Sequence, residues 1–162
     1  MDSRLVLLKL FLNELGVSDS INEIDDRKSI QKAVYLGQRL AGVDLGYRFG
    51  WYLRGPYSPS LTQDYYALAD SLSADDKEWE RKSLKPEIAR KLRKNARVLE
   101  KPKKVELSDA DWLELVASVD FLRNVRKRDD EEVQRILKKE KPHLIDFVDD
   151  AFMHLDTFEN DQ

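Results

Sequence analysis

The chain has 162 residues, enough for one domain with a real core, and its 41% content of hydrophobic residues is ordinary for a globular fold. The absence of cysteine excludes a disulfide framework, a thiolate zinc site and a cysteine nucleophile, and it suits the reducing cytoplasm. The net charge of −3 conceals an asymmetry, because the charged residues of segment 81–104 are nearly all basic, whereas no Lys or Arg follows Pro142 and the charged residues there are acidic.

The apolar run near the N-terminus is predicted to be a core helix. Leucines recur at helical spacing through residues 5–15, and Gly16 is placed to end the helix. Lys9 and Glu14 interrupt the run, and no small-residue cleavage site of a secretory signal follows it. No stretch approaches the roughly 18 uninterrupted apolar residues of a membrane span, so no membrane association is expected.

A second helix is predicted over about residues 27–41, where Asp25 or Asp26 can cap the start. A glycine inside a helix costs about 1 kcal/mol relative to alanine, so Gly37 indicates close approach by another backbone. The inward face of this helix would comprise Ile30, Ala33, Val34, Gly37 and Ala41.

Residues 47–61, with the sequence YRFGWYLRGPYSPSL, gather aromatic side chains, turn formers and a helix start. Apolar and more polar side chains alternate from residue 47 to 54, which predicts a strand with one buried face. Gly55 and Pro56 are expected to end that strand. Ser58 then suits the N-cap of a helix and Pro59 its first position. The helix would bury Leu61, Tyr65, Leu68 and Leu72.

Four further helices are predicted after a polar connection at residues 71–83, in which Trp79 is expected to pack. The first, over residues 86–99, carries a solvated basic ridge formed by Arg90, Arg93, Lys94 and Arg97. Ser108 is placed to cap the second, and Asp129 or Asp130 to open the third. The last follows Pro142 and is acidic over residues 143–158.

The fold predicted from these elements is a single, mainly α domain spanning residues 1–162, with a short β-strand or hairpin. An alternative for the N-terminal half is a winged-helix-like unit, because two helices precede a strand that turns sharply into another helix. Only one strand is evident, however, and a strand needs a partner.

Three segments carry a resemblance to known proteins. They are Lys28 to Leu36 (KSIQKAVYL), Gly46 to Tyr52 (GYRFGWY) and Gly55 to Leu61 (GPYSPSL). Together they resemble the YwgA-like small bacterial proteins and, more remotely, the Panacea antitoxin-like domain. The resemblance covers about residues 25–72. It implies a mostly helical, non-enzymatic protein of the kind often encoded near phage genes or toxin–antitoxin systems.

No catalytic signature is found, so no enzyme activity, metal or cofactor is predicted. The two histidines, His143 and His154, are expected on the last helix about 16 Å apart, too far to share one metal ion. His154 could pair with Asp150, one turn away. No phosphate-binding glycine loop or nucleophile elbow is present.

Two binding functions are compared. The preferred one is docking of a protein partner, since Trp, Tyr and Arg dominate interface hot spots. Its candidate residues are Arg48, Trp51, Tyr52, Arg54, Gly55, Pro56 and Tyr57. The alternative for Tyr47, Phe49 and Trp51 is that they belong to the core. The alternative is nucleic-acid binding through the basic ridge, unless the acidic C-terminal helix neutralises it. Its candidate residues are Lys28, Lys32, Arg90, Arg93, Lys94 and Arg97, with Arg39 as a further extension.

Overall fold

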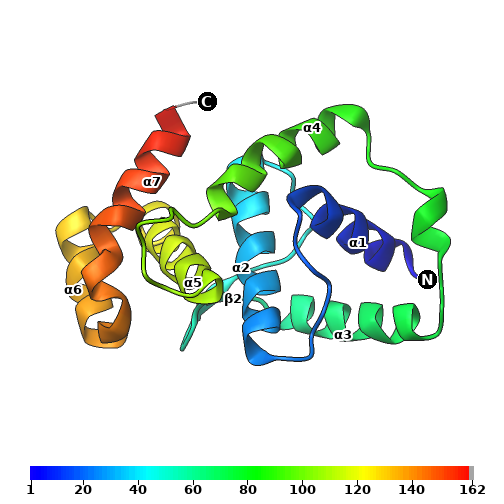
Figure 1. The fold of residues 1–162 in the computed structure, drawn as a ribbon, viewed down its shortest axis with the longest axis horizontal. Helices are drawn as coiled ribbons and strands as arrows, with labels where there is room; N and C mark the ends of the chain where they lie inside the picture. Colours follow the sequence, from blue (N-terminus) through cyan, green and yellow to red (C-terminus); the bar gives the residue numbers. More distant parts are fainter. Residues whose placement is uncertain (161–162) are drawn as a thin grey trace.

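The computed structural model describes residues 1–160, which form seven α-helices and one two-stranded hairpin (Figure 1). The helices are α1 (Ser3–Leu15), α2 (Ile24–Ala41), α3 (Pro59–Ser73), α4 (Pro86–Asn95), α5 (Asp109–Asp120), α6 (Asp130–Glu140) and α7 (Val148–Asn160). Strands β1 (Gly50–Tyr52) and β2 (Gly55–Tyr57) are antiparallel. Short turns complete the chain, namely the 3₁₀ turns η1 (Glu78–Arg81), η2 (Ala96–Leu99) and η4 (Pro142–Phe147) and the π turn η3 (Phe121–Val125). The predicted mainly α domain with a short hairpin is confirmed.

The first two helices follow the sequence pattern closely. Gly16 ends α1 in the left-handed conformation, with φ of 71°. Helix α2 begins at Ile24, so the prediction that Asp25 or Asp26 caps it was wrong: the N-cap is Glu23, and both aspartates lie in the first turn. The Asp26 carboxylate accepts a hydrogen bond from the Glu23 N–H (3.1 Å). Gly37 does face a close neighbour, but the neighbour is a side chain, because a Cβ at Gly37 would lie 2.6 Å from the ring of Phe11. The expectation of a close backbone was therefore wrong.

The aromatic stretch forms a tight hairpin instead of one long strand. Gly50 pairs with Tyr57, and Tyr52 with Gly55. The prediction that the strand reaches residue 54 was wrong, because Leu53 lies in the turn and is 86% exposed. Gly55 and Pro56 begin the second strand rather than ending the first. Gly55 has φ of +90°, and a Cβ there would lie 2.6 Å from the Ser118 Oγ, so both conformation and space require glycine.

The C-terminal half contains the predicted helix starts but more interruptions. Ser58 caps α3, Ser108 caps α5 and Asp129 caps α6, each accepting a hydrogen bond from a first-turn N–H. The helix predicted over residues 86–99 changes to 3₁₀ geometry at Ala96. The last predicted helix likewise starts as the 3₁₀ turn η4 and becomes α-helical only at Val148.

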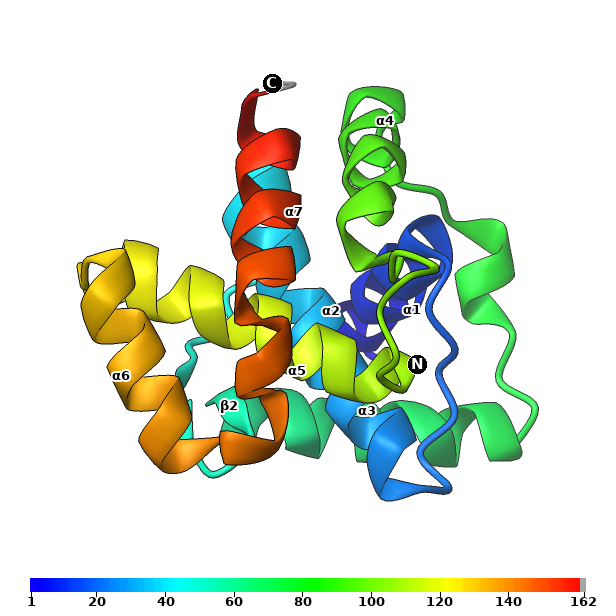
Figure 2. The same cartoon turned by 60° about the vertical axis from the view of Figure 1, so that its left-hand side comes forward.

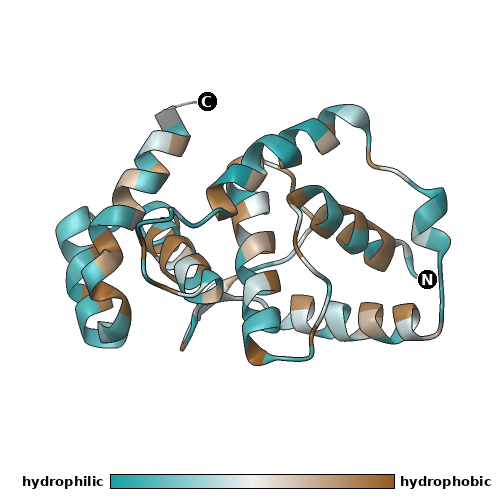
Figure 3. Ribbon diagram, in the orientation of Figure 1, coloured by the Kyte–Doolittle hydropathy of each residue, from teal (hydrophilic) through white to brown (hydrophobic). Residues whose placement is uncertain are grey.

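Two clusters of buried apolar side chains meet at α2. The first joins α1, α2 and α3 with Leu92 of α4, whereas the second joins α5, α6 and α7 with Tyr35 and Leu36 of α2. Helix α2 thus contributes buried side chains to both clusters, and both ribbon views show it between α1 and α5 (Figures 1 and 2). Coloured by hydropathy, α1 and α5 are largely apolar, whereas α4 and α6 are largely polar (Figure 3). None of the described helices has the length and apolarity needed to cross a lipid bilayer.

Candidate functional site

Two buried lysine side chains, Lys32 and Lys141, donate hydrogen bonds to the backbone of the hairpin. The Lys32 Nζ donates to the carbonyl oxygen of Pro56 (2.7 Å), and the Lys141 Nζ donates to that of Leu53 (2.7 Å). Gln31 makes two further bonds where the hairpin enters α3, accepting from the Ser58 N–H (2.9 Å) and donating to the Ser58 carbonyl (3.0 Å). These bonds give partners to backbone groups of the hairpin, which is thereby held by α2 and by Lys141, the residue that follows α6.

Glu114 of α5 lies at the centre of this lysine group. Its Oε1 accepts from the Lys28 Nζ (3.0 Å) and its Oε2 from the Lys141 Nζ (2.9 Å), and all three residues are buried. Lys28 also pairs with Asp111 at 2.7 Å. Burial tends to raise the pKa of Glu114, but the hydrogen bonds from Lys141 and Lys28 outweigh it and lower that pKa. For Lys28 the net shift is upward: burial lowers its pKa, but the hydrogen bonds and charges of Asp111 and Glu114 outweigh burial and raise the pKa above its usual value.

Lys32 differs from its two lysine neighbours. It is buried, and within the described chain no carboxylate lies close enough to form an ion pair with it. Burial lowers the pKa of Lys32 to about 7, because the more distant charge of Glu114 only partly offsets the burial, and because Lys141, Lys28 and Arg54 are also positive. The site therefore holds a buried amine that is partly uncharged at neutral pH.

Beside Lys32, an open pocket of about 300 Å³ lies between α2, the hairpin and α3. Ile24 and Tyr66 at this pocket are each 46% exposed. Arg54 is exposed as well, and no ion-pair partner is found for it among residues 1–160. The lining is thus cationic and aromatic: Ile24, Arg27, Lys28, Gln31, Lys32, Arg54, Tyr57, Thr62, Tyr65 and Tyr66.

The structure separates the predicted protein-docking residues into three groups. Tyr52 and Arg54 are exposed and Tyr57 is half-buried, and the rings of Tyr52 and Tyr57 are in edge contact with centroids 5.1 Å apart. Gly55 and Pro56 are buried, so they shape the hairpin rather than offer a contact surface. Of the predicted docking residues, only Arg54 and Tyr57 line the pocket. Trp51 is half-buried and stacks on Phe121 (5.8 Å), and Arg48 pairs with Asp44 (3.6 Å).

The predicted nucleic-acid surface is only partly assembled. Arg90, Arg93, Lys94 and Arg97 are all exposed, as the ridge requires. The expected extension by Lys28 and Lys32 is corrected, because both side chains are buried beneath the hairpin and cannot reach a phosphate backbone at the ridge. Arg39 is held by Asp120. In both ribbon views the hairpin and α4 lie at opposite sides of the molecule (Figures 1 and 2).

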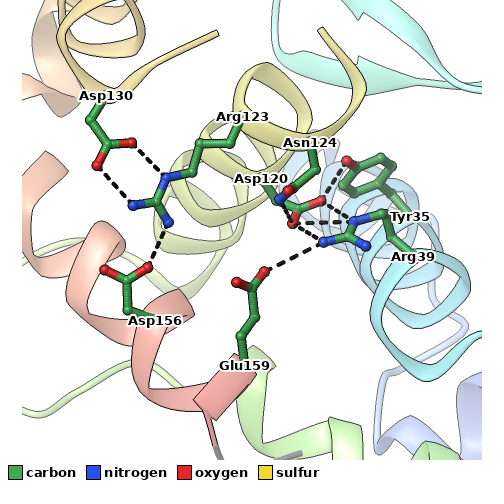
Figure 4. Close-up of polar contacts among 8 residues, drawn as sticks. All are labelled: Tyr35, Arg39, Asp120, Arg123, Asn124, Asp130, Asp156 and Glu159. Atoms are coloured by element: carbon green, nitrogen blue, oxygen red, sulfur yellow. Dashed lines mark hydrogen bonds and ion pairs between the residues drawn. The ribbon is translucent and has the colours of Figure 1, made fainter. Parts of the chain in front are cut away.

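A second polar network surrounds Asp120, at the end of α5 (Figure 4). The buried Asp120 carboxylate accepts from the Tyr35 hydroxyl (2.6 Å), from the Arg39 guanidinium (2.9 Å) and from the Asn124 side chain (2.9 Å). Burial, followed by the Asp120 charge and hydrogen bond, raises the pKa of Tyr35 well above its usual range. Arg39 reaches on to Glu159 of α7 (3.4 Å).

Arg123 extends these contacts to two other elements. It pairs with Asp130 at the start of α6 (2.8 Å) and with Asp156 of α7 (2.9 Å) (Figure 4). The hydrogen bond to Asp130 is the largest of the influences that raise the pKa of Arg123. The contacts of Arg39 and Arg123 together fasten α7 to the rest of the fold.

The two histidines occupy separate environments. His143 is exposed on η4, whereas the His154 Nε2 lies 2.8 Å from the carbonyl oxygen of Val98. The pairing of His154 with Asp150 was wrong, because Asp150 instead meets Lys104 (3.2 Å). Among residues 1–160 no three His, Asp or Glu side chains converge as metal ligands.

Sequence reasoning missed several parts of the site. Lys28, Gln31 and Lys32 form a polar stripe within the otherwise apolar α2, and such a stripe indicates buried hydrogen bonds as readily as a basic surface. Lys141 and Glu114 are brought to the site only by tertiary packing, so their spacing carried no signal. Comparison of the chain with protein-family models, curated proteins and solved structures finds no match.

Proposed function

We propose that this is a non-enzymatic cytoplasmic binding protein that docks a protein partner through the hairpin and the adjoining faces of α2 and α3. The observation that carries the proposal is the exposure of apolar side chains on a backbone that buried groups hold in place. Leu53 is the most exposed large hydrophobic residue of the described chain, and Tyr52, Ile24 and Tyr66 are each close to half exposed. Exposed apolar groups combined with Arg54 have the composition of an interface hot spot.

The hairpin backbone supports this function through its rigidity. Carbonyl oxygens of Leu53 and Pro56 accept from buried lysines, so the turn presents its side chains without first having to be ordered. A surface that is already organised loses less conformational entropy on binding. The resemblance of residues 25–72 to YwgA-like and Panacea-like proteins suggests a setting in toxin–antitoxin or phage-defence systems.

Site-specific photo-crosslinking in the native host tests the docking surface. A photoreactive amino acid at Leu53 is expected to capture one discrete partner. The same group at Met153, which is also well exposed but lies on α7, provides the matched control. Identical products from the two positions, or none from Leu53, would contradict the assignment. Arg54→Ala is expected to weaken capture while leaving the melting temperature unchanged, because no described residue pairs with Arg54.

Nucleic-acid binding through α4 is the second candidate, and one observation favours it. Only the Lys104–Asp150 ion pair (3.2 Å) joins the basic segment 81–104 to the described part of the acidic segment 143–158, and Arg93 pairs instead with Glu14 of α1 (3.0 Å). The ridge is therefore largely unneutralised by the acidic helix.

A salt titration separates this candidate from protein docking. Phosphate contacts by the four ridge residues predict a log–log slope of affinity against salt of about −3.6 on duplex DNA, at roughly −0.9 per contact. Arg93→Glu combined with Arg97→Glu should abolish such binding for any sequence alike. We expect no submicromolar binding at physiological salt. Binding of that strength, lost in the double variant, would favour the second candidate over the first.

A further inference from the structure

The charges around Glu114 do not balance inside the molecule. Lys28, Lys32 and Lys141 all lie within the group, whereas the carboxylates that contact them are Glu114 and Asp111. Lys28 and Lys141 contact both oxygens of Glu114, Lys28 also contacts the Asp111 Oδ1, and the Lys32 Nζ donates only to a carbonyl oxygen. A buried ammonium group is stable only with a counter-charge, so this arrangement favours an anion from outside.

The geometry around Lys32 provides access for such an anion. An ammonium group has three N–H donors, and the described contacts of Lys32 use one of them, toward the Pro56 carbonyl. Lys32 is also part of the lining of the pocket between α2, the hairpin and α3. Lys32 is only 1% exposed, so a group that enters this pocket reaches the remaining donors once the side chains that cover Lys32 move aside.

The rest of the lining selects the kind of anion. Arg54 is exposed at the pocket, and Arg27 contributes a second guanidinium that is half-buried and donates to the Ile21 carbonyl (2.8 Å). Tyr57, Tyr65 and Tyr66 supply aromatic walls, with the rings of Tyr65 and Tyr66 5.2 Å apart. Positive groups beside aromatic walls fit a single carboxylate on a short apolar stem, as in glutamate or aspartate.

We propose that this pocket receives an acidic side chain of the docked protein, with its carboxylate paired to Lys32 and Arg54. The inference rests on the proposed docking function and names the chemistry of the partner: an acidic residue flanked by an apolar one. Lys32 is then the specificity-determining residue of the interface, and the exposed apolar groups of the hairpin supply the surrounding contact.

A linked proton distinguishes this pairing from ordinary surface attraction. In the free protein Lys32 has a pKa of about 7, set by its burial and by Glu114 of α5, Lys141 after α6, Lys28 of α2 and Arg54 of the hairpin. An entering carboxylate favours the charged amine and raises that pKa, so binding near neutral pH is accompanied by proton uptake. Affinity should accordingly fall as the pH rises above 7.

Nuclear magnetic resonance of the full-length protein with ¹³C-labelled lysine tests the pairing. The probe is the dipeptide acetyl-Glu-Leu-amide, and its uncharged match is acetyl-Gln-Leu-amide. The glutamate probe should shift the Lys32 Cε resonance and raise its titration midpoint, whereas the glutamine probe should not. Arg54→Ala should weaken binding of the glutamate probe about fivefold, as expected for loss of an exposed ion pair. Equal responses to the two dipeptides, or no response of Lys32 to either, would overturn the proposal.

Two controls keep the outcomes distinct. Inorganic phosphate is titrated in parallel, and a stronger response to phosphate than to the glutamate probe would reassign the pocket to small anions and overturn the proposal. Lys91→Met removes an exposed lysine of α4 that lies outside the basic ridge and should leave the response unchanged. If crosslinking at Leu53 captures a partner but the Lys32 Cε resonance does not respond to the glutamate probe, only this inference fails. If Lys32 responds but no partner is captured, the docking function fails.

Discussion

Two carboxylates of α5, Glu114 and Asp120, are almost completely buried but have different surroundings. Asp120 accepts hydrogen bonds from a tyrosine, an arginine and an asparagine, and its network continues to the surface at Glu159. Glu114 accepts from two buried lysines and leaves a third without a carboxylate. The comparison indicates that the Asp120 network is complete and fastens α7, whereas the Glu114 network has a surplus charge beside an open pocket.

The largest expected effect is loss of the central carboxylate at Glu114. Glu114→Gln leaves Lys141 (1% exposed) as a buried ammonium group with no carboxylate partner in the described chain, and leaves Lys28 (4% exposed) with Asp111 alone. Removal of one partner of a buried ion pair costs about 3–5 kcal/mol. Asp120→Asn should cost less, since the Arg39 side chain is 32% exposed and can turn toward water. Denaturant unfolding of both variants measures the difference. An Asp120→Asn loss equal to or greater than that of Glu114→Gln would break the comparison.

A smaller effect should appear in the pH dependence of stability. The unfolded chain keeps Lys32 protonated up to about pH 10.5, whereas the folded protein releases this proton near pH 7. Between these values the unfolded state binds more protons, so the free energy of unfolding should rise with pH, by roughly 2 kcal/mol from pH 7 to 9. Lys28 is not expected to cancel the rise, because its raised pKa places its titration above 10.5.

Lys32→Met provides the test of that rise, because methionine fills a similar volume without a titrating group. Urea unfolding at pH 7, 8 and 9 should show a flat profile for this variant. Lys94→Met, at an exposed position on α4, should retain the slope of the unaltered protein. If the free energy of unfolding of Lys32→Met still rises with pH, then Lys32 is not the group with the lowered pKa, and the surplus charge must lie on another residue.

The smallest effect is expected at the outer edge of the Asp120 network. Glu159→Gln removes an exposed contact to Arg39 (3.4 Å) but leaves the bonds between Arg39 and Asp120 in place. Exposed ion pairs contribute about 0–1 kcal/mol, so the change in unfolding free energy should stay within roughly 0.5 kcal/mol. Thermal and urea unfolding measure it. A loss comparable to that of Asp120→Asn would mean that Glu159 belongs to the buried network.

Local signals predicted the helices well, because caps and apolar spacing depend on nearby residues. Gly16, Ser58 and Ser108 end or begin helices as expected. The hairpin was harder, since β1 and β2 are three residues each and alternation over so short a stretch does not fix the register. Gly55 resembled a strand breaker in sequence, whereas in the fold it permits close packing against α5.

The candidate site was predicted only in part. The exposed aromatic and arginine side chains of the hairpin follow from composition, as Tyr52 and Arg54 illustrate. The pairing of Glu114 with Lys141 joins residues far apart along the chain, and no local pattern encodes it. Lys28 and Lys32 were assigned to a basic surface because charged residues are usually exposed, and in this protein tertiary hydrogen bonds override that tendency.

The position of α2 between two cores has a consequence for synthesis of the chain. As the protein leaves the ribosome, residues 1–100 can assemble α1 to α4 around Ile30 and Val34, but the partners of Tyr35 and Leu36 in α5 have not yet emerged. The apolar face of α2 that carries Tyr35 and Leu36 therefore stays exposed to solvent until residues 109–120 have emerged. We expect chaperones that recognise apolar segments to bind during this interval, and release to coincide with the emergence of α5.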